Sequence, residues 1–265
     1  MSESSPPRLR GLAPYVGGKR VLAATIIKRI QEIPHTTYVE PFVGMGGVFF
    51  RRPERARAEI INDLSGDVAT LFRVLQRHYL PFVEMLRWQL TTRAEFERLV
   101  RTDPGTLTDL ERAARFFYLQ KTAFGGKVAG RNFGVSPAEG AAFDVTRIVP
   151  ELEAYHLRLV GAVVERLPYA ECIARYDRPA TLFFLDPPYL GSEHYYGEGM
   201  FGRADFEALA EILRGLKGRF LMTINDASEV RSIFKGFEMQ AAKVSYGVGG
   251  GASPARELII SGKRP

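Results

Sequence analysis

The sequence predicts an α/β fold in which strands and helices alternate around a mainly parallel sheet. One sign is the apolar run Leu182 to Leu185, which is typical of a strand covered on both faces, as in parallel sheets. A second sign is a short strand that leads through a Gly-x-Gly-Gly turn into an apolar helix, between Tyr38 and Phe50. At 265 residues, 46% of them hydrophobic, the chain is long enough for one large domain and a smaller insertion.

The expected elements follow this alternation along the chain. Apolar positions at helical spacing predict helices over residues 19–33, 67–78, 203–216 and 228–234. Short apolar runs predict strands over residues 38–41, 59–61, 182–185, 220–224 and 258–261. Between Arg73 and Tyr169 the alternation gives way to a helix-rich, arginine-rich stretch. We therefore expect a main domain formed by residues 1–72 and 170–265, with an inserted domain over residues 73–169.

The strand at 182–185 ends at the sequence Asp-Pro-Pro-Tyr, residues 186–189. Neither proline can donate a backbone hydrogen bond, and the residue before each is restricted to extended geometry, so the strand stops there. A carboxylate, a carbonyl-bearing turn and an aromatic ring thus meet at the carboxyl end of a strand, where open α/β sheets bind ligands. For these four residues alone, a capping aspartate before a proline-rich turn is a competing interpretation.

These groups suit chemistry on the exocyclic amine of a nucleobase. Such an amine is a poor nucleophile because its lone pair is delocalised into the ring. The carboxylate of Asp186 and a carbonyl of the following turn could accept its two N–H bonds, localise the lone pair and stabilise the positive charge that develops during methyl transfer. The ring of Tyr189 would give an extruded base a stacking surface.

The Gly-x-Gly-Gly turn points to a nucleotide-like ligand. Glycines allow the chain to turn tightly and let a ligand approach the backbone closely. Asp63 lies 17 positions beyond Gly46 and follows a second short strand. A glycine turn followed after about 20 residues by an acid is the Rossmann arrangement, in which the acid holds ribose hydroxyls. An Asx turn or a helix cap before residues 64–66 is a compatible role for Asp63.

Taken in order, these motifs resemble those of the Dam-type DNA adenine-N6 methyltransferases, also called the D12 class. Residues 15–19, Tyr-Val-Gly-Gly-Lys, resemble the family's Trp-Ala-Gly-Gly-Lys element, and residues 40–49 resemble its Glu-Pro-Phe-Val-Gly-x-Gly turn. The remaining similarities lie at Asn62-Asp63, at Tyr118-Leu119 with Phe124 to Gly126, at the Asp-Pro-Pro-Tyr of 186–189 and at the closing strand 256–260. Two positions depart from the pattern: Tyr15 stands in place of the tryptophan, and Gly125 in place of an asparagine.

The resemblance implies a Rossmann-like S-adenosylmethionine-dependent methyltransferase fold with an inserted, mainly helical target-recognition domain. In that case the main domain is catalytic, S-adenosylmethionine is the methyl donor, and the substrate is an adenine flipped out of double-stranded DNA. The donor-binding residues would be Tyr15, Lys19, Glu40, Phe42, Gly44, Gly46, Asp63 and Asp186. The catalytic residues would be Asp186, Pro187, Pro188 and Tyr189.

Individual roles also follow from the resemblance. Lys19 would pair with the carboxylate of the donor, Asp63 would hold its ribose, and the ring of Tyr15 would pack on it. Without the resemblance, Lys19 would be interpreted as a solvated charge in the first turn of the helix at 19–33.

Positive charge is concentrated in the expected insertion. Residues 73–131 hold 11 Lys/Arg and 6 Asp/Glu, a net +5 against +6 for the whole chain. Basic side chains gain affinity for duplex DNA by releasing the counterions condensed on its phosphates. A solvated helical face is the competing interpretation for any single arginine in this stretch.

Two loops are candidates for contact with DNA. Within the first, over residues 124–134 and the preceding helix, the candidate side chains are Lys121, Lys127, Arg131, Asn132 and Phe133. Basic and amide groups can address base edges, and an aromatic ring can fill the space that a flipped base leaves. An ordinary surface loop with Phe133 tucked into the core is equally consistent with this sequence. The second loop is the glycine-rich stretch Gly247 to Ser253, for which a hairpin connection that turns at Ser253-Pro254 is the alternative.

Other features narrow the class of protein. The single cysteine, Cys172, excludes an intramolecular disulfide, and the four histidines show no ligand spacing, so we expect no metal. The polar residues 1–14 and the absence of long apolar runs predict a cytoplasmic protein that binds no membrane, and we expect a monomer or weak dimer. A cytosine-N4 methyltransferase, an RNA adenine methyltransferase and a catalytically silent DNA-binding regulator remain open. Restriction-modification, evasion of defence by a phage, and regulatory methylation all remain open as the biological setting.

Overall fold

The computed structural model describes residues 9–15, 19, 21–134, 143–190, 201–248 and 251–262, with the side chains of 243–248 and 251–255 left aside. Two compact units are present. The first contains residues 1–18, 44–52 and 65–161, and the second contains residues 19–43, 53–64 and 162–265.

The second unit is built on a seven-stranded sheet in the order β3-β2-β1-β4-β5-β7-β6. Its strands are β1 (Thr37–Glu40), β2 (Ala58–Asn62), β3 (Val163–Glu165), β4 (Thr181–Leu185), β5 (Arg219–Asn225), β6 (Glu238–Val248) and β7 (Gly251–Ser261). The strands β1 to β5 are parallel to one another, and β7 runs antiparallel between β5 and β6. The mixed α/β architecture predicted from the sequence is confirmed, with a Rossmann-like sheet that is mostly parallel.

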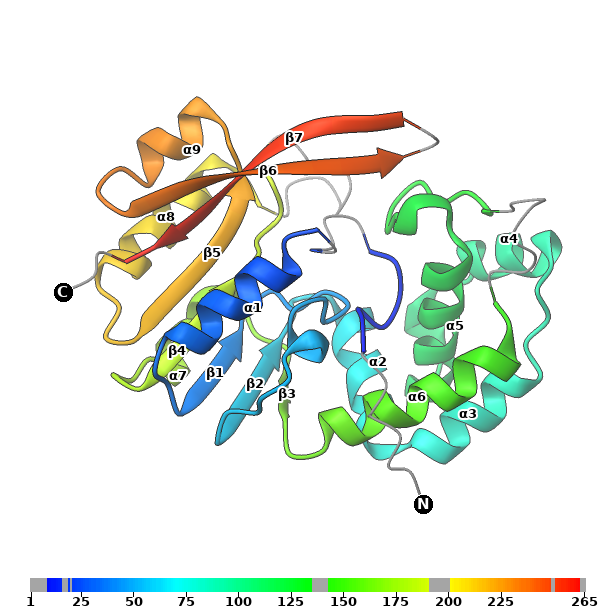
Figure 1. The fold of residues 1–265 in the computed structure, drawn as a ribbon. Helices are drawn as coiled ribbons and strands as arrows, with labels where there is room; N and C mark the ends of the chain where they lie inside the picture. Colours follow the sequence, from blue (N-terminus) through cyan, green and yellow to red (C-terminus); the bar gives the residue numbers. More distant parts are fainter. Residues whose placement is uncertain are drawn as a thin grey trace, which may run out of the picture. The chain divides into compact units, whose positions relative to one another are not determined.

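Both faces of the central strands are covered, as Figure 1 shows for α1 (Ala23–Glu32) on one side of the sheet and α8 (Arg203–Arg214) on the other. All five residues of β4 are buried. Alternate residues such as Phe183 and Leu185 join one core with α7 (Tyr169–Tyr176), α8 and α9 (Ser228–Ile233). Because side chains alternate along a strand, the residues between them face the side of the sheet that α1 covers.

The first unit is helical. Its helices are α2 (Gly66–Arg77), α3 (Tyr79–Arg87), α4 (Arg93–Arg101), α5 (Asp109–Thr122) and α6 (Val145–Leu159), with short 3-10 turns at Phe49–Arg51, Pro104–Thr106 and Phe124–Gly126. The helix α5 begins with a capping box, in which Thr108 and Glu111 satisfy each other's backbone N–H groups. Its residues Phe116, Phe117 and Tyr118 are almost completely buried, which makes α5 the centre of this unit.

The predicted elements are recovered, with differences at their ends. The helix expected from Lys19 begins only at Ala23. The sequence analysis missed β3, α7 and β6. The predicted loop over 247–253 is wrong, because β6 extends to Val248, β7 starts at Gly251, and Pro254 pairs with Ser245 inside the hairpin. The hairpin alternative is therefore correct, but its turn does not lie at Ser253-Pro254. Before residue 257, β7 has no partner in β5, so this part of the hairpin is a two-stranded ribbon.

No helix in the described part of the chain is long and apolar enough to cross a membrane. The division into a main domain and an insertion over 73–169 stays a prediction. The helices α3 to α6 that occupy most of that stretch all belong to the first unit.

A close backbone approach fixes the start of the loop that follows α5. The fully buried side chain of Gln120 donates to the carbonyls of Pro14, at 3.1 Å, and of Gly126, at 3.2 Å. Gly126 has a φ of +66°, and a Cβ there would lie 2.7 Å from the carbonyl carbon of Pro14 and the nitrogen of Tyr15. Only glycine fits this position, since both the backbone conformation and the contact exclude a side chain.

We expect Gly126→Ala to lower the free energy of unfolding by about 2–4 kcal/mol, through left-handed strain plus a backbone clash. Gly125→Ala is the matched control, because Gly125 has a similar φ of +68° with nothing within 4 Å of its Cβ position. That substitution should cost about 1 kcal/mol, and Gly125→Asn less, since asparagine tolerates this conformation. Urea unfolding of the three variants measures the difference. Equal losses at Gly125 and Gly126 would show that the contact with Pro14 and Tyr15 does not matter.

Candidate active site

The carboxyl ends of the parallel strands are held together by Asn62, the last residue of β2. Its side chain is 1% exposed. Its amide nitrogen donates to the carbonyls of Pro41, at 2.9 Å, and Leu167, at 3.0 Å, and its amide oxygen accepts from the backbone of Leu167 at 2.8 Å. The backbone of Val43 donates to the carbonyl of Asn62. One buried amide therefore positions the segments that leave β1 and β3.

Asp186 occupies the first position beyond β4 and forms a buried ion pair. Its Oδ1 lies 2.7 Å from Nζ of Lys19 and accepts a hydrogen bond from Oγ1 of Thr223 at 3.0 Å. The side chain of Lys19 is 2% exposed and that of Asp186 is 20% exposed. The structure thus brings together two residues that are 167 positions apart. The interpretation of Lys19 as a solvated charge in a helical turn is wrong, because the residue is buried and precedes α1.

Opposing effects act on the carboxyl of Asp186. Burial raises its pKa, because a charged carboxylate loses solvation there, while the Lys19 ammonium and the Thr223 hydroxyl act in the opposite direction. The ionised form of Asp186 therefore depends on both Lys19 and Thr223 for its stabilisation. The sequence analysis did not single out Thr223, although a lone hydroxyl inside the apolar run of β5 was a signal for it.

The residues after Asp186 stay close to the ion pair. Nζ of Lys19 lies 4.6 Å from the centre of the Tyr189 ring, a cation–π contact. Pro187 is buried, and Pro188 and Tyr189 are half-buried. Residues 186–189 have no regular secondary structure, as the two prolines predict.

The first unit contains the glycine turn. Gly44 and Gly46 have φ values of +50° and +68°. A Cβ on Gly44 would lie 3.3 Å from the ring of Tyr15, and one on Gly46 would lie 2.5 Å from the ring of Phe50. The predicted donor-binding residues Tyr15 and Gly44 are therefore in contact. The ring of Phe50 leaves no room for a side chain at Gly46, while at Gly44 the positive φ and the tight contact with Tyr15 both favour glycine.

The other predicted donor-binding residues lie at strand ends in the second unit. Glu40 is the last residue of β1, is 2% exposed and accepts a hydrogen bond from the hydroxyl of Tyr38 at 2.7 Å. Phe42 packs against the rings of Tyr169 and Phe201. Asp63 follows β2 directly and is half-buried. The residue that caps α2 is Ser65, whose hydroxyl accepts from the backbone of Val68.

The loop after α5 contains two cations that are largely withdrawn from solvent. Burial lowers the pKa of Arg131 to about 10, and its guanidinium donates to Gln120, at 2.8 Å, and to the carbonyl of Lys127, at 3.2 Å. Burial also lowers the pKa of Lys121, whose ammonium lies over the ring of Phe117. Phe133 packs against the ring of Phe96, and the guanidinium of Arg93 lies over it. Asn132 is exposed.

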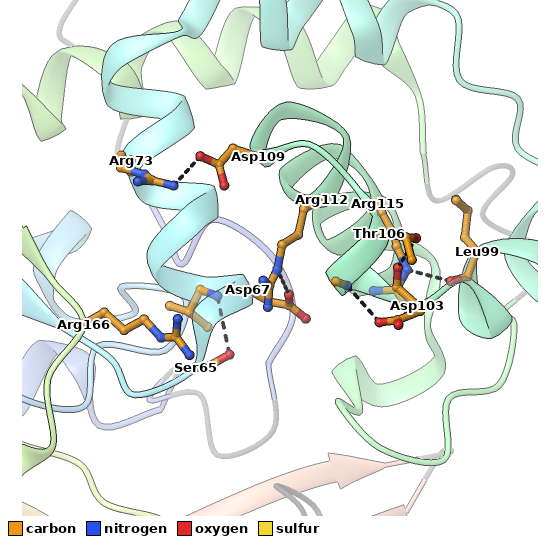
Figure 2. Close-up of polar contacts among 12 residues, drawn as sticks. Ser65, Asp67, Arg73, Leu99, Asp103, Thr106, Asp109, Arg112, Arg115 and Arg166 are labelled. Atoms are coloured by element: carbon orange, nitrogen blue, oxygen red, sulfur yellow. Dashed lines mark hydrogen bonds and ion pairs between the residues drawn. The ribbon is translucent and has the colours of Figure 1, made fainter.

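Several arginines of the positively charged stretch are bound to partners within the first unit, as Figure 2 shows. Arg73 pairs with Asp109 at 2.5 Å, and Arg112 pairs with Asp67 at 2.6 Å. Arg115 is 7% exposed and donates to the carbonyl of Leu99 at 2.7 Å. The net charge of this stretch therefore overstates the positive charge that is available to a ligand.

Metal ligands are not grouped in the described part of the chain, where no cluster of three His, Cys, Asp or Glu side chains could hold an ion. Cys172 is buried, and burial raises the pKa of its thiol to about 12. Its packing in the core under β4 is that of a small apolar residue.

Comparisons with known proteins address the family directly. A sequence profile of the family described as D12 class N6 adenine-specific DNA methyltransferase matches residues 15–247. The type II methyltransferase M.CviBI of Paramecium bursaria Chlorella virus NC1A is 23% identical over 236 residues, which cover 86% of this chain and 88% of that protein. Among solved structures, precorrin 8W decarboxylase of Methanobacterium thermoautotrophicum aligns over 92% of this chain and 90% of its own, with 10% identity and a TM-score of 0.41. That structural likeness is too distant to bear on function.

The buried ion pair predicts a pH-dependent loss of stability in Lys19→Met. Without the ammonium, the pKa of Asp186 in the folded protein rises further above its unfolded value. The variant then folds with little penalty in acid, where Asp186 is protonated, and is destabilised as the pH rises through the folded-state pKa. At pH 8 we expect a loss of about 3 kcal/mol, typical of a buried pair from which one partner is removed.

Thermal melting between pH 4.5 and pH 8.5 measures this effect. Arg73→Met is the matched control, because the side chains of Arg73 and Asp109 are 52% and 61% exposed. Exposed pairs contribute about 0–1 kcal/mol, so this variant should melt close to the wild type at every pH. A Lys19→Met variant with a constant, pH-independent loss would contradict the assigned role of the pair.

Proposed function

The chain belongs to the D12 class N6 adenine-specific DNA methyltransferase family, and we propose that it takes the methyl group from S-adenosylmethionine and acts on adenine extruded from duplex DNA. Membership of the family and the likeness to a type II methyltransferase establish the enzyme as a site-specific DNA methyltransferase that modifies adenine N6. The proposal concerns the donor, the residues and the path of the reaction. The observation that carries it is the ion pair of Lys19 and Asp186 at the end of β4, with Thr223 as its third partner.

The available residues fit S-adenosylmethionine. Bound donor would supply a methyl group on a sulfonium, which leaves as a neutral thioether. An ammonium has three donor hydrogens, so Lys19 can pair with Asp186 and still bind a carboxylate of the donor. Asp63, at the end of β2, is placed as Rossmann folds place the acid that binds ribose hydroxyls. Tyr15, Glu40, Phe42, Gly44 and Gly46 complete the proposed donor-binding set.

At the reacting amine, the roles fall to residues 186–189. Asp186 and the carbonyl of Pro187 accept the two N6 hydrogens, and the ring of Tyr189 stacks on the base. Pro188 fixes the turn between them. The bound donor would supply the methyl group, and the electron pair of the broken C–S bond would stay on its sulfur. Positive charge moves to N6 and is lost as a proton on the side of Asp186. The carboxylate thus stabilises the transition state more than the neutral amine.

We propose that the inserted domain, residues 73–169, holds the duplex. Among the predicted contact residues, exposed Asn132 is suited to read a base edge and Lys127 to bind phosphate. Lys121 and Phe133 would also contact the DNA, from the two ends of the same loop. Arg131 already donates to Gln120 and to a loop carbonyl, so its share in DNA binding would be to order the loop.

The direct test is incubation of the protein with methyl-labelled S-adenosylmethionine and mixed duplex DNA, followed by nucleoside digestion and mass spectrometry. Label in N6-methyladenine supports donor and acceptor together. Label in N4-methylcytosine, or in adenine of RNA alone, would contradict the acceptor. A protein that binds duplex DNA but neither binds the donor nor methylates would be a regulator.

We expect Asp186→Ala to reduce kcat by at least about 10³-fold, because the variant loses the acceptor that stabilises charge on N6. Binding to duplex DNA should stay within about twofold of the wild type, measured by fluorescence anisotropy at fixed salt. Thr223→Val keeps the carboxylate and removes one hydrogen bond to it, so it should cost only about 10-fold. Methylation by Asp186→Ala at the wild-type rate would show that the site is elsewhere.

Asp63→Ala should mainly affect donor binding. Loss of a charged hydrogen-bond acceptor for the ribose corresponds to about 1.5–3 kcal/mol, or roughly 10- to 100-fold in Kd for S-adenosylmethionine. Isothermal titration calorimetry measures this constant without turnover. Asp67→Ala is a control carboxylate, because Asp67 pairs with Arg112 within the first unit. An unchanged Kd in Asp63→Ala would remove Asp63 from the donor site.

A further inference from the structure

A second buried carboxylate lies on the same face of the sheet as the ion pair. Glu257, in β7, is 1% exposed, and neither of its carboxylate oxygens accepts a hydrogen bond of normal geometry from a described residue. Burial of a charged group without hydrogen bonds is costly, and such groups are rare in folded proteins. Because burying the Glu257 carboxylate lowers stability, we expect its charge to have a function that a neutral side chain could not perform.

The strand register places Glu257 beside the proposed active site. In the antiparallel pair of β5 and β7, Glu257 lies opposite Asn225, and Ile259 lies opposite Thr223. Side chains at directly opposed positions share a face with Cβ atoms about 5 Å apart, and the next position on that face is two residues along. Thr223 is two residues along β5 from Asn225, so it is the next side chain on the face that Glu257 shares. The hydroxyl of Thr223 donates to Asp186.

Among the described residues, the Lys19 ammonium is the cation whose charge acts on Glu257. The amide nitrogen of Asn225 donates to the carbonyl of Leu190 at 3.1 Å, and its oxygen has no donor among the described residues. Asn225 is thus turned so that it does not donate to Glu257. The Tyr189 hydroxyl is close enough to lower the pKa of the Glu257 carboxyl. The negative charge of Asp186 is also close, and it raises that pKa.

We propose that Glu257 is a positioning residue for methyl transfer, which shares the Lys19 ammonium with Asp186 and so keeps Asp186 available as an anion for the target amine. This inference rests on the function proposed above for Asp186. Glu257 itself touches neither substrate nor donor in this role, and it acts through Lys19.

The proposed effect of Glu257 on methyl transfer depends on the net charge of Lys19, Asp186 and Glu257 together. With Asp186 and Glu257 both ionised, two carboxylates and one ammonium carry a net charge of −1. With Glu257 neutral, Lys19 and Asp186 cancel each other. During the reaction, positive charge moves from the sulfonium to N6, next to Asp186. A site with net charge −1 favours this movement, and a neutral site does not.

Because Glu257 can take up a proton, the net charge of Lys19, Asp186 and Glu257 depends on pH. Burial raises the pKa of Glu257 and the nearby Asp186 raises it further, while Lys19 and the Tyr189 hydroxyl lower it. Glu40 of β1, another carboxylate on this face, accepts a hydrogen bond from the hydroxyl of Tyr38. As the pH falls through the raised pKa of Glu257, the group becomes neutral and kcat should decrease, at a higher pH than an ordinary glutamate would cause.

The variant Glu257→Gln separates this role from a structural one. Glutamine keeps the shape, removes a buried charge and can donate to the unpartnered oxygen of Asn225, so we expect a melting temperature equal to or above that of the wild type. We also expect a 10- to 100-fold lower kcat at pH 8, an unchanged Kd for duplex DNA, and loss of the acid limb that Glu257 contributes to the pH profile. Glu257→Asp keeps the charge and should retain that limb with an intermediate kcat.

Glu238→Gln is the matched control, since Glu238 is an exposed strand glutamate in β6 whose carboxylate accepts from Ser261. It should leave both kcat and the pH profile unchanged. Wild-type kcat with a wild-type acid limb in Glu257→Gln would overturn the proposal. It would also be overturned by a pH-independent loss of kcat with a lower melting temperature in both Glu257 variants. Failure of the function proposed above is distinct, because the wild-type protein would then transfer no methyl group to adenine N6.

Discussion

Burial of the parallel strands on both faces is the constraint on which the arrangement of this protein depends. Every residue of β4 is buried, so a charged side chain inside the strand would have no solvent and no partner. In β1, β2 and β4, the polar groups of the candidate site lie at or just beyond the strand ends, as Glu40, Asn62 and Asp186 do. There they are held by contacts between segments that are distant in sequence. The candidate active site is a consequence of how the sheet terminates.

At this edge the ion pair of Lys19 and Asp186 is tolerated because each charge has more than one partner. Asp186 accepts from Thr223, and Lys19 lies over the Tyr189 ring. A buried pair is rarely a net gain in stability over well-packed apolar residues. The presence of this ion pair is explained if the reaction needs Asp186 in its ionised form, which Lys19 stabilises. The burial of Glu257 without a hydrogen bond of normal geometry from a described residue fits the same view, since proteins accept lower stability at sites that function requires.

The sequence was sufficient where a local pattern decides the structure. The apolar run of β4 and its proline stop, and the glycine turn, were read correctly because strand burial and positive φ leave direct signals. The role of Lys19 was ambiguous, since nothing near residue 19 reveals a partner 167 positions away. The strand β3 has only three residues, which is too short for periodicity. Proline 254 inside β7 was mistaken for a turn, although it lies in a ribbon without a partner in β5.

Charge counts are the least direct of these signals, and the structure shows why. A count treats all 11 Lys/Arg between 73 and 131 alike. Arg115 is buried and Arg131 is half-buried, and both guanidiniums donate to backbone or amide oxygens, so turning them to a phosphate would leave those acceptors unpaired. Arg73 is different, because its partner Asp109 is exposed. An exposed pair contributes about 0–1 kcal/mol, so Arg73 can exchange Asp109 for a phosphate at little cost. The cost of releasing the present partner, rather than the number of cations, thus decides which side chains can bind DNA.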